Sequence, residues 1–259
     1  MPSPGRVWIG TSGFSYRHWR GGVFYPAGLV QRQELEYYAR HFDTLELNNS
    51  FYRLPTVERF AAWRDRTPAH FVFAVKASRF ITHIRRLRGC REAVDLLLTN
   101  ARALGPKLGP ILFQLPADIA RDCARLREFL SILPRDLRFV FEFRNPAWLV
   151  EPVHELLRAH DAAICLAVNA LAPAPQPQLT ASFSYLRMHV GGGPEGAFTE
   201  PELRHWSQVI GKLRDRGADL YVYFNNDWRG FAIADAQRLR KLLTAGGQAK
   251  SRSSTKRRA

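Results

Sequence analysis

Cysteine and long apolar runs are both scarce in this chain of 259 residues. The three cysteines, Cys90, Cys123 and Cys165, are odd in number and show no CxxC spacing, which excludes a disulfide framework and a structural zinc site. We expect them to be buried as small hydrophobic side chains. The longest apolar run, residues 162–168, is far shorter than the ~18 residues that a membrane-spanning helix needs. With no secretory signal in MPSPGRVWIG, the sequence predicts a cytoplasmic protein that does not enter a membrane.

Acidic residues are also few, since 23 Asp and Glu stand against 38 Lys and Arg, for a formal net charge of +15. The last ten residues, KSRSSTKRRA, hold five of these cations and no anion. Without them, 33 basic and 23 acidic residues leave +10 on the rest of the chain. Hydrophobic residues make up 46%, which is enough for a core and excludes a disordered or collagen-like chain. A basic surface can hold an anionic substrate or nucleic acid, or be covered by water alone.

Eight short segments rich in β-branched and aromatic residues recur along the chain, and helical periodicity follows most of them. Their starts are spaced by about 30 residues, the length of one strand, one helix and two loops. Eight such units predict a fold of the α/β class, a single (β/α)₈ TIM barrel over residues 1–245. The expected strands are residues 7–13, 44–50, 71–77, 109–116, 138–145, 162–169, 183–190 and 219–227.

Two loops interrupt this rhythm without marking a domain boundary, because the barrel needs the strands on both sides of each. A long aromatic loop, FSYRHWRGGVFYPAG, follows the first strand, and the proline-rich LAPAPQPQLT after the sixth is expected to be extended. Thr199 and Glu202 have the spacing of a capping box, which predicts a helix start near Glu200. From Gly246 the composition predicts a disordered basic tail over residues 246–259.

Alternation divides each expected strand into one face toward the helices and one toward the barrel axis. In the fifth strand, Phe139, Phe141 and Phe143 face the helices, so Glu142 and Arg144 face the axis. The axis-facing side chains become polar near the carboxyl end of nearly every strand, where active sites of this fold lie. These residues are Glu46, Asn48, Lys76, Gln114, Glu142, Arg144, Asn169, Arg187, His189 and Asn225, with Tyr223 one inward position earlier. Desolvating so many polar groups costs stability, so their coincidence predicts a functional site.

Several runs resemble those of the YecE-like family of TIM barrels, a domain of unknown function. They are GTSGFSYRHWRGGVFYP, LELNNSFYRLP, FAVKASRFITH, KLGPILFQLP, FEFRNPAW, YLRMHV and YVYFNND, which occur in family order over about residues 7–240. The resemblance implies the barrel fold and supplies no reaction. This chain departs from the family at Asn169, where an Asp is common, and at Ser182, where the usual run is closer to TADF. The missing Asp weakens any metal site that would use a carboxylate at the sixth strand.

Acid–base chemistry without a cofactor is what these residues favour. The candidate catalytic groups are Glu142, Glu46, Lys76 and His189, with Glu142 as the general acid or base. The candidate substrate-binding residues are Asn48, Gln114, Arg144, Arg187, Tyr223 and Asn225. The cations Lys76, Arg144 and Arg187 favour an anionic, sugar- or phosphate-like small molecule. Lys76 has a second candidate role, a Schiff base with a carbonyl substrate, if the neighbouring arginines lower its pKa.

A divalent metal at Glu46, Glu142 and His189, with His83 as a further ligand, is the alternative chemistry. Three neighbouring cations would surround such an ion with like charge, so the sequence favours a site that holds no metal. The glycines at 191–193 follow the seventh strand, where many barrels bind phosphate. A plain flexible loop is the simpler interpretation of three glycines.

Two other function classes stay open on the sequence. Nucleic-acid binding or processing, in one version metal-dependent, is supported by the basic tail and by Arg85, Arg86 and Arg88 within residues 79–91. Against it, the chain shows no zinc finger, RNP motif or recognition-helix pattern, and charge runs are usually solvated. The third class is a barrel that binds a ligand or a protein partner without turnover.

Overall fold

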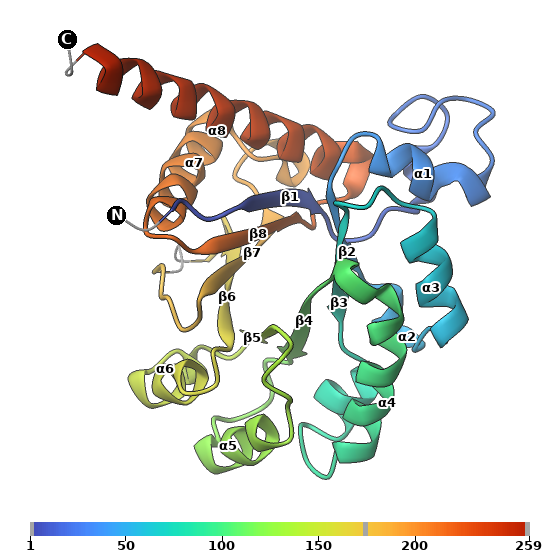
Figure 1. The fold of residues 1–259 in the computed structure, drawn as a ribbon, viewed down its shortest axis with the longest axis vertical. Coiled ribbons are helices and arrows are strands. Elements are labelled where there is room, and N and C mark those ends of the chain that lie inside the picture. The colour runs from blue at the N-terminus through green and yellow to red at the C-terminus, as the bar shows by residue number, and fades with distance from the viewer. Residues whose placement is uncertain (1–2, 173–175, 257–259) are drawn as a thin grey trace.

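The computed structural model describes residues 3–172 and 176–256, and the chain forms a TIM barrel (Figure 1). Eight parallel strands lie in the order β1-β8-β7-β6-β5-β4-β3-β2. All eight expected segments are confirmed as strands, with ends shifted by up to a few residues. The strands are β1 (Val7–Thr11), β2 (Thr44–Leu47), β3 (Val72–Lys76), β4 (Leu108–Leu115), β5 (Phe139–Phe143), β6 (Ala163–Asn169), β7 (Phe183–Val190) and β8 (Asp219–Phe224).

Helices between the strands surround the barrel (Figure 1). The α-helices are α1 (Glu34–Ala39), α2 (Asn49–Tyr52), α3 (Val57–Asp65), α4 (Arg91–Ala101), α5 (Cys123–Ser131), α6 (Glu151–Arg158), α7 (Glu200–Asp215) and α8 (Phe231–Lys256). Shorter helical turns are η1 (Arg17–Trp19), η2 (Gln31–Gln33), η3 (Phe80–Ile84), η4 (Arg102–Lys107), η5 (Pro146–Trp148), η6 (Pro194–Gly196) and η7 (Trp228–Gly230). Within its described residues, the proline-rich connection from β6 to β7 contains no helix, as expected. Helix α7 starts directly after Thr199 with both hydrogen bonds of the capping box.

Helix α8 continues to Lys256 and projects past the barrel (Figure 1). Its backbone therefore crosses residue 245, where the sequence predicted that the barrel domain ends. The side chains from Gly246 onward and all of residues 257–259 lie outside the described residues. Disorder of the tail, residues 246–259, stays a prediction. No helix in residues 3–172 and 176–256 is both long and apolar enough to cross a membrane.

The barrel closes between β1 and β2 with the help of one tyrosine. The Gly13 N–H donates to the carbonyl of Glu46 over 2.8 Å at the carboxyl end of this seam. The Tyr38 hydroxyl of α1 accepts from the Thr11 N–H at 2.9 Å and donates to the Thr44 carbonyl at 3.1 Å. A side chain thus replaces ladder hydrogen bonds that the two strands do not form directly. The closure holds the end of β2, and with it Glu46, beside the end of β1.

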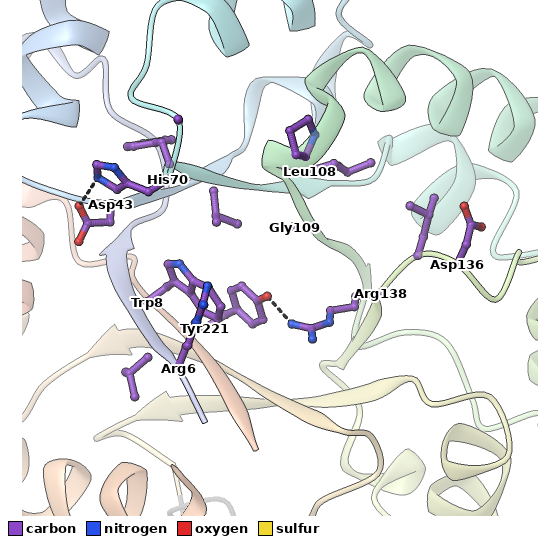
Figure 2. A pocket seen from close by; sticks show the side chains of 15 residues that line it. Arg6, Trp8, Asp43, His70, Leu108, Gly109, Asp136, Arg138 and Tyr221 are labelled. Carbon is purple, nitrogen blue, oxygen red and sulfur yellow. Dashed lines mark hydrogen bonds and ion pairs between the residues drawn. The ribbon is translucent and has the colours of Figure 1, made fainter. Parts of the chain in front are cut away.

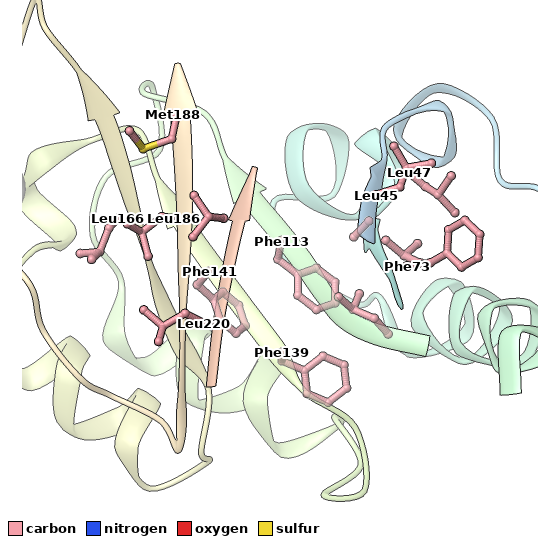
Figure 3. Packing of buried hydrophobic residues seen from close by; sticks show 14 of the residues in the cluster. Leu45, Leu47, Phe73, Phe113, Phe139, Phe141, Leu166, Leu186, Met188 and Leu220 are labelled. Atoms are coloured by element: carbon pink, nitrogen blue, oxygen red, sulfur yellow. The ribbon is translucent and has the colours of Figure 1, made fainter. Parts of the chain in front are cut away.

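Apolar side chains on the outer faces of the strands pack under the helices (Figure 3). Phe139, Phe141 and Phe143 of β5 are buried in this layer, as the alternation predicted. Phe143 also stacks on Trp148, with ring centroids 4.8 Å apart. Because this aromatic face fixes the orientation of β5, the opposite face turns Glu142 toward the axis.

The barrel axis is filled below the polar residues. The cluster there consists of Ala74, Leu112, Val140, Ala163, Cys165, Phe183, Tyr185, Tyr221 and Tyr223. These positions confirm the inward faces that the alternation predicted for β3 to β8. Tyr223, a candidate substrate-binding residue, belongs to this buried layer, and its hydroxyl lies 2.7 Å from Thr44 Oγ1. Its hydroxyl therefore bonds inside the barrel wall rather than to a ligand above it.

A cavity of about 680 Å³ opens at the amino ends of the strands (Figure 2). Trp8 stacks on Tyr221 there, with ring centroids 4.7 Å apart and planes only 4° from parallel. Arg138 donates to the Tyr221 hydroxyl over 2.5 Å and to Asp219 over 2.9 Å. Arg138 at this end of the barrel is therefore joined to a carboxylate and to the ring system of Trp8 and Tyr221.

Candidate functional site

The carboxyl ends of the strands surround a larger cavity, of about 990 Å³. Its lining includes six of the predicted site residues, which are Asn48, Lys76, Gln114, Arg144, Arg187 and Asn225. Glu46, Glu142 and His189 join this set through ion pairs and hydrogen bonds to Arg187 or to each other. Nine of the ten predicted residues therefore come together, and only Tyr223 lies in the layer below.

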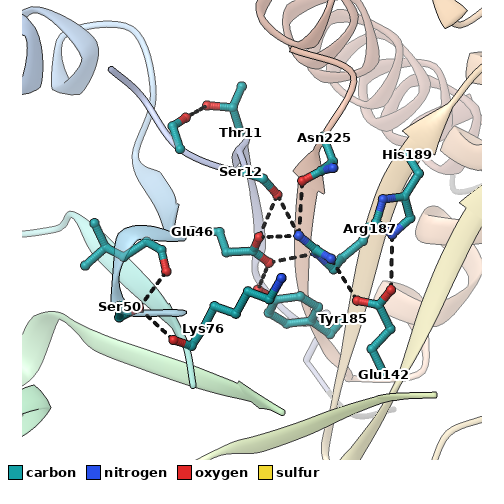
Figure 4. A network of polar contacts seen from close by, with 12 residues as sticks. Thr11, Ser12, Glu46, Ser50, Lys76, Glu142, Tyr185, Arg187, His189 and Asn225 are labelled. Carbon is teal, nitrogen blue, oxygen red and sulfur yellow. Dashed lines mark hydrogen bonds and ion pairs between the residues drawn. The ribbon is translucent and has the colours of Figure 1, made fainter. Parts of the chain in front are cut away.

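Arg187 of β7 is the centre of a buried polar network (Figure 4). Its Nε and Nη2 donate to the two carboxylate oxygens of Glu46, over 3.1 and 2.8 Å. Its Nη1 donates to Glu142 over 2.8 Å, and Nη2 also donates to Asn225 Oδ1 over 3.1 Å. Both carboxylates are fully buried, and Arg187 is 2% exposed. One planar guanidinium thus holds carboxylates from β2 and β5 in a fixed arrangement.

Glu46 accepts two further hydrogen bonds on the side of β1 and β7. The Ser12 hydroxyl and the Tyr185 hydroxyl each donate to its carboxylate over 2.6 Å. Burial raises the pKa of Glu46, but the charge of Arg187 and these hydrogen bonds outweigh burial, so the pKa lies below its ordinary value. Glu46 is therefore an ionised group that fixes Arg187 in place.

Glu142 connects Arg187 to Arg144 and His189. Its Oε1 lies 2.8 Å from Arg144 Nε and 3.3 Å from His189 Nε2. Burial raises the pKa of Glu142, but the Arg187 charge and the contacts with His189 and Arg144 hold it well below the ordinary range. At neutral pH this carboxylate is ionised and has no proton to donate. The geometry therefore favours Glu142 as a base, or as the partner of a base, over an acid.

His189 lies between Glu142 and Arg144. Its Nε2 is 3.3 Å from the Glu142 carboxylate and 3.2 Å from Arg144 Nη2. Burial lowers the pKa of His189 although Glu142 opposes that effect, so the ring is neutral at pH 7. Nε2 donates to Glu142 in one tautomer and accepts from Arg144 in the other.

Lys76 is a cation beside this network that is not paired within it. The two arginines of the network balance its two carboxylates, and Lys76 forms no ion pair with any carboxylate of the described chain. Its Nζ lies 4.2 Å from the centroid of the Phe51 ring. Burial, followed by the nearby charge of Arg187, lowers the pKa of Lys76 from 10.5 to about 8. The site therefore carries excess positive charge on a lysine that exchanges its proton near neutral pH.

Two asparagines at strand ends differ in what their side chains do. Asn169 Oδ1 accepts from the Leu171 N–H over 2.9 Å, so this residue caps a turn. Asn48 begins α2 without capping it, and its Oδ1 is buried with no hydrogen-bond partner in the described chain. A buried acceptor without a partner is costly. Since Asn48 lines the cavity, a ligand that donates a hydrogen bond would satisfy it.

Ser12 and Tyr16 belong to the site, although the sequence analysis assigned them no role there. Ser12 follows β1 and donates to Glu46, and the Tyr16 hydroxyl donates to the Ser12 carbonyl. The two-residue alternation along β1 is the signal that identifies Ser12 as an inward residue. Farther along the aromatic loop, Trp19 packs on the barrel, since it is fully buried and its Nε1 donates to the Asp227 carbonyl over 2.7 Å.

The glycine loop after β7 uses its amides internally. The N–H groups of Gly191 and Gly193 donate to backbone carbonyls of the same loop, and that of Gly192 donates to the Glu202 carboxylate. These donors are therefore occupied. Residues 191–193 therefore offer no free amides as a cradle for phosphate, and the flexibility that the sequence suggested for this loop stays a prediction.

The donor groups do not fit a divalent metal in this arrangement. Within residues 3–172 and 176–256, no three His, Cys, Asp or Glu side chains are placed to hold one. The guanidinium of Arg187 lies between Glu46 and Glu142 and bonds the oxygens that a cation would need. His83, the further ligand that the sequence suggested, packs edge-on against Phe51 with ring centroids 5.0 Å apart.

Comparison with known proteins gives a family and close structural relatives. The family described as "Protein of unknown function DUF72" matches residues 8–258. The UPF0759 protein YecE of Escherichia coli K12 is 33% identical over 151 residues, which cover 58% of this chain and 52% of that protein. The match thus spans about half the length of that relative. The UPF0759 protein YunF of Bacillus subtilis is 23% identical over 271 residues, covering 92% of this chain and 94% of that protein.

Solved structures agree with the fold. A DUF72 family protein from Thermotoga maritima has a TM-score of 0.81 and 28% identity, covering 92% of this chain and 99% of that one. A DUF72 family protein from Enterococcus faecalis has a TM-score of 0.76 and 20% identity, covering 93% and 98%. At the latter identity the likeness supports the fold alone.

Proposed function

This chain belongs to the DUF72 family of proteins of unknown function, and from that premise we propose that it is a metal-independent acid–base enzyme. Its substrate is a polar, anionic small molecule of sugar or phosphate character. One observation carries the proposal: a cavity of about 990 Å³ stands over a charge-balanced ion network and contains a lysine, Lys76, that has no ionic partner among the described residues. The buried ion network makes part of the barrel interior polar, which costs stability. A catalytic role explains why that cost is tolerated.

Anion binding follows from the charges that face the cavity. In the described part of the chain Lys76 has no carboxylate partner, and Arg144 lines the same cavity with a side chain that is 38% exposed. Both cations come from strand ends, so a barrel of fixed geometry sets their separation. In a partly desolvated pocket, such cations bind a carboxylate or phosphate more strongly than surface lysines do. Asn48 would accept a hydrogen bond from a hydroxyl group of the same ligand.

Acid–base chemistry is assigned to three titratable groups of the site, Lys76, Glu142 and His189. Lys76, with a pKa of about 8, serves as an acid or a base near neutral pH. The ionised Glu142 and the neutral His189 form a second pair that accepts a proton from the ligand. Glu46 acts at a distance by holding Arg187. The cytoplasm stays the predicted compartment for this activity.

A thermal-shift screen of anionic metabolites, with and without EDTA, tests this proposal. We expect a small set of anions to raise the melting temperature equally in both conditions. The shift should fall for Lys76→Met and persist for Lys212→Met, a matched change at an exposed lysine on α7. A shift that EDTA abolishes and one divalent metal restores would contradict metal independence.

DNA titration at several salt concentrations and turnover assays, read beside the same screen, separate the two other function classes. Affinity for generic DNA that collapses with salt, in the absence of any small-anion effect, would favour nucleic-acid binding. Saturable anion binding without turnover of any ligand found would favour a binding barrel. Either result would replace the enzyme as the assigned function.

A further inference from the structure

We propose that Lys76 forms an imine with its substrate, so that the substrate class narrows to anionic aldehydes and ketones such as 2-oxo acids and sugar phosphates. The inference rests on the proposed function, because the same anion site must hold the molecule against the lysine. It adds a covalent step, and a chemical class of substrate, that anion binding alone does not require.

The position of Lys76 meets the geometric demands of such a nucleophile. Its side chain extends from the end of β3 toward the buried network (Figure 4) and lines the cavity. No carboxylate of the described chain pairs with its Nζ, which instead lies over the face of Phe51. An ion pair would hold the ammonium protonated and direct it away from a ligand. The absence of such a pair leaves Nζ free to meet a carbonyl carbon.

The surroundings of Lys76 also favour its neutral, nucleophilic form. Burial and the charge of Arg187 lower its pKa to about 8, and Arg144 adds to the repulsion. A fraction of the amine is therefore unprotonated at neutral pH, in contrast to a solvated lysine. The charges of Glu46 and Glu142 oppose this shift, and the face of Phe51 also favours the charged form.

The choice of lysine at this position is informative because lysine is rare in this chain. The chain has six lysines among its 38 Lys and Arg residues, so arginine supplies most of the positive charge. Within the described part of the chain, Lys76 is the only lysine that lines the cavity. An arginine there would bind an anion as well or better, but its guanidinium stays protonated and cannot attack a carbonyl.

The step balances without an oxidant or reductant. The Nζ lone pair attacks the carbonyl carbon, a C–N bond forms, and a proton from nitrogen moves to the oxygen to give a carbinolamine. The C–O bond then breaks as the C=N double bond forms, and the oxygen leaves as water with the second proton of the nitrogen. Arg144 holds the anionic group of the substrate meanwhile. Hydrolysis of the imine reverses each step and returns the free lysine.

Borohydride trapping tests the inference on the full chain. The protein is incubated with glyoxylate, pyruvate or glyceraldehyde 3-phosphate, reduced, and analysed by intact mass and peptide mapping. We expect at least one of these probes to give a single adduct on Lys76, whose added mass is that of the probe less one oxygen atom. Lys76→Arg should lower the adduct yield by about 10-fold or more, whereas Lys241→Arg, an exposed control, should leave it unchanged.

Thermal shifts measured on the same samples separate this inference from the proposed function. Lys76→Arg keeps the positive charge, so it should still be stabilised by the anions that stabilise the unmodified protein. Stabilisation without an adduct on Lys76 for any of the three probes would overturn the imine and leave anion binding intact. Adducts spread evenly over Lys76, Lys212 and Lys241 would overturn it as well. If no anion stabilises the protein at all, the proposed function itself fails.

Discussion

The two ends of the barrel use similar residue types for opposite purposes. At the amino end, Arg138 bonds Asp219 and the Tyr221 hydroxyl and also lies over the Phe183 ring. At the carboxyl end, Lys76 has no carboxylate partner among the described residues. Each end has a cavity, so a cavity by itself does not identify the functional site. Polar groups that the fold leaves without partners do, because their cost needs a compensating role.

The two ends also differ in how their charges are buried. Arg138 has a side chain that is 38% exposed, and it pairs with a partly exposed aspartate. Arg187 and its two glutamates are almost entirely buried, and each ion there has lost nearly all of its hydration. A buried network of this kind adds little net stability, yet removing one member is costly. Substitutions at the two ends should therefore have unequal effects, which the following predictions compare.

The largest expected effect is on turnover and comes from Glu142→Gln. Glutamine keeps the shape of the side chain but cannot accept a proton from the ligand or from His189. Once the screen supplies a substrate, turnover should fall by about 10² to 10⁴ while ligand affinity changes little. Asp219→Asn, the matched change at the amino end, should leave turnover unaltered. Near-normal turnover in Glu142→Gln would eliminate this assignment and leave Glu46 as the carboxylate candidate.

The next largest effect is on stability, in Arg187→Met. This change strands two buried carboxylates, so the free energy of unfolding should fall by about 3–5 kcal/mol. Arg138→Met breaks a half-exposed pair and should cost about 1 kcal/mol or less. Urea denaturation of both variants measures the difference. Equal losses at the two ends would show that the network at the carboxyl end is not specially buried.

Lowering the pH should reduce the stability that the buried carboxylates contribute at the carboxyl end of the barrel. The folded-state pKa values of Glu46 and Glu142 are lowered, so the folded state binds fewer protons than the unfolded one. Their contribution is complete above the unfolded pKa of about 4.3 and is lost as pH falls through the folded values. Urea denaturation at pH 7 and at pH 3 measures this loss. Between the two pH values, the free energy of unfolding should fall by at least about 1 kcal/mol more for the unmodified protein than for Glu142→Gln. Parallel profiles would contradict the lowered pKa of Glu142.

The smallest effect should come from the C-terminus, outside both ends of the barrel. Deletion of residues 250–259 should change the melting temperature by no more than about 2 °C, because chain ends with few packed groups add little stability. Nonspecific DNA affinity should fall, since five cations are lost. Differential scanning fluorimetry and DNA titration at two salt concentrations measure both. A large loss of thermal stability would instead show that this segment docks on the barrel.

The sequence by itself determined the barrel and the face on which each strand carries its polar residues. The period of about 30 residues and the two-residue alternation are local properties that survive without knowledge of contacts. Glu142 shows this well, because Phe141 and Phe143 on either side of it had to face the helices. The same reasoning, applied to β1, identifies Ser12, so that omission was not a limit of the sequence.

Only the tertiary structure decided which polar groups are paired. On the sequence, Glu46, Glu142 and Lys76 were all candidate catalytic groups at strand ends, and no ion pair could be assigned among them. The structure buries both carboxylates against Arg187 and leaves Lys76 facing the cavity. It also places Tyr223 one layer too deep to reach a ligand. The physical reason is that pairing depends on side-chain reach between β2, β5 and β7, strands far apart in the chain and not adjacent in the sheet, whose ends face one another only when the barrel closes.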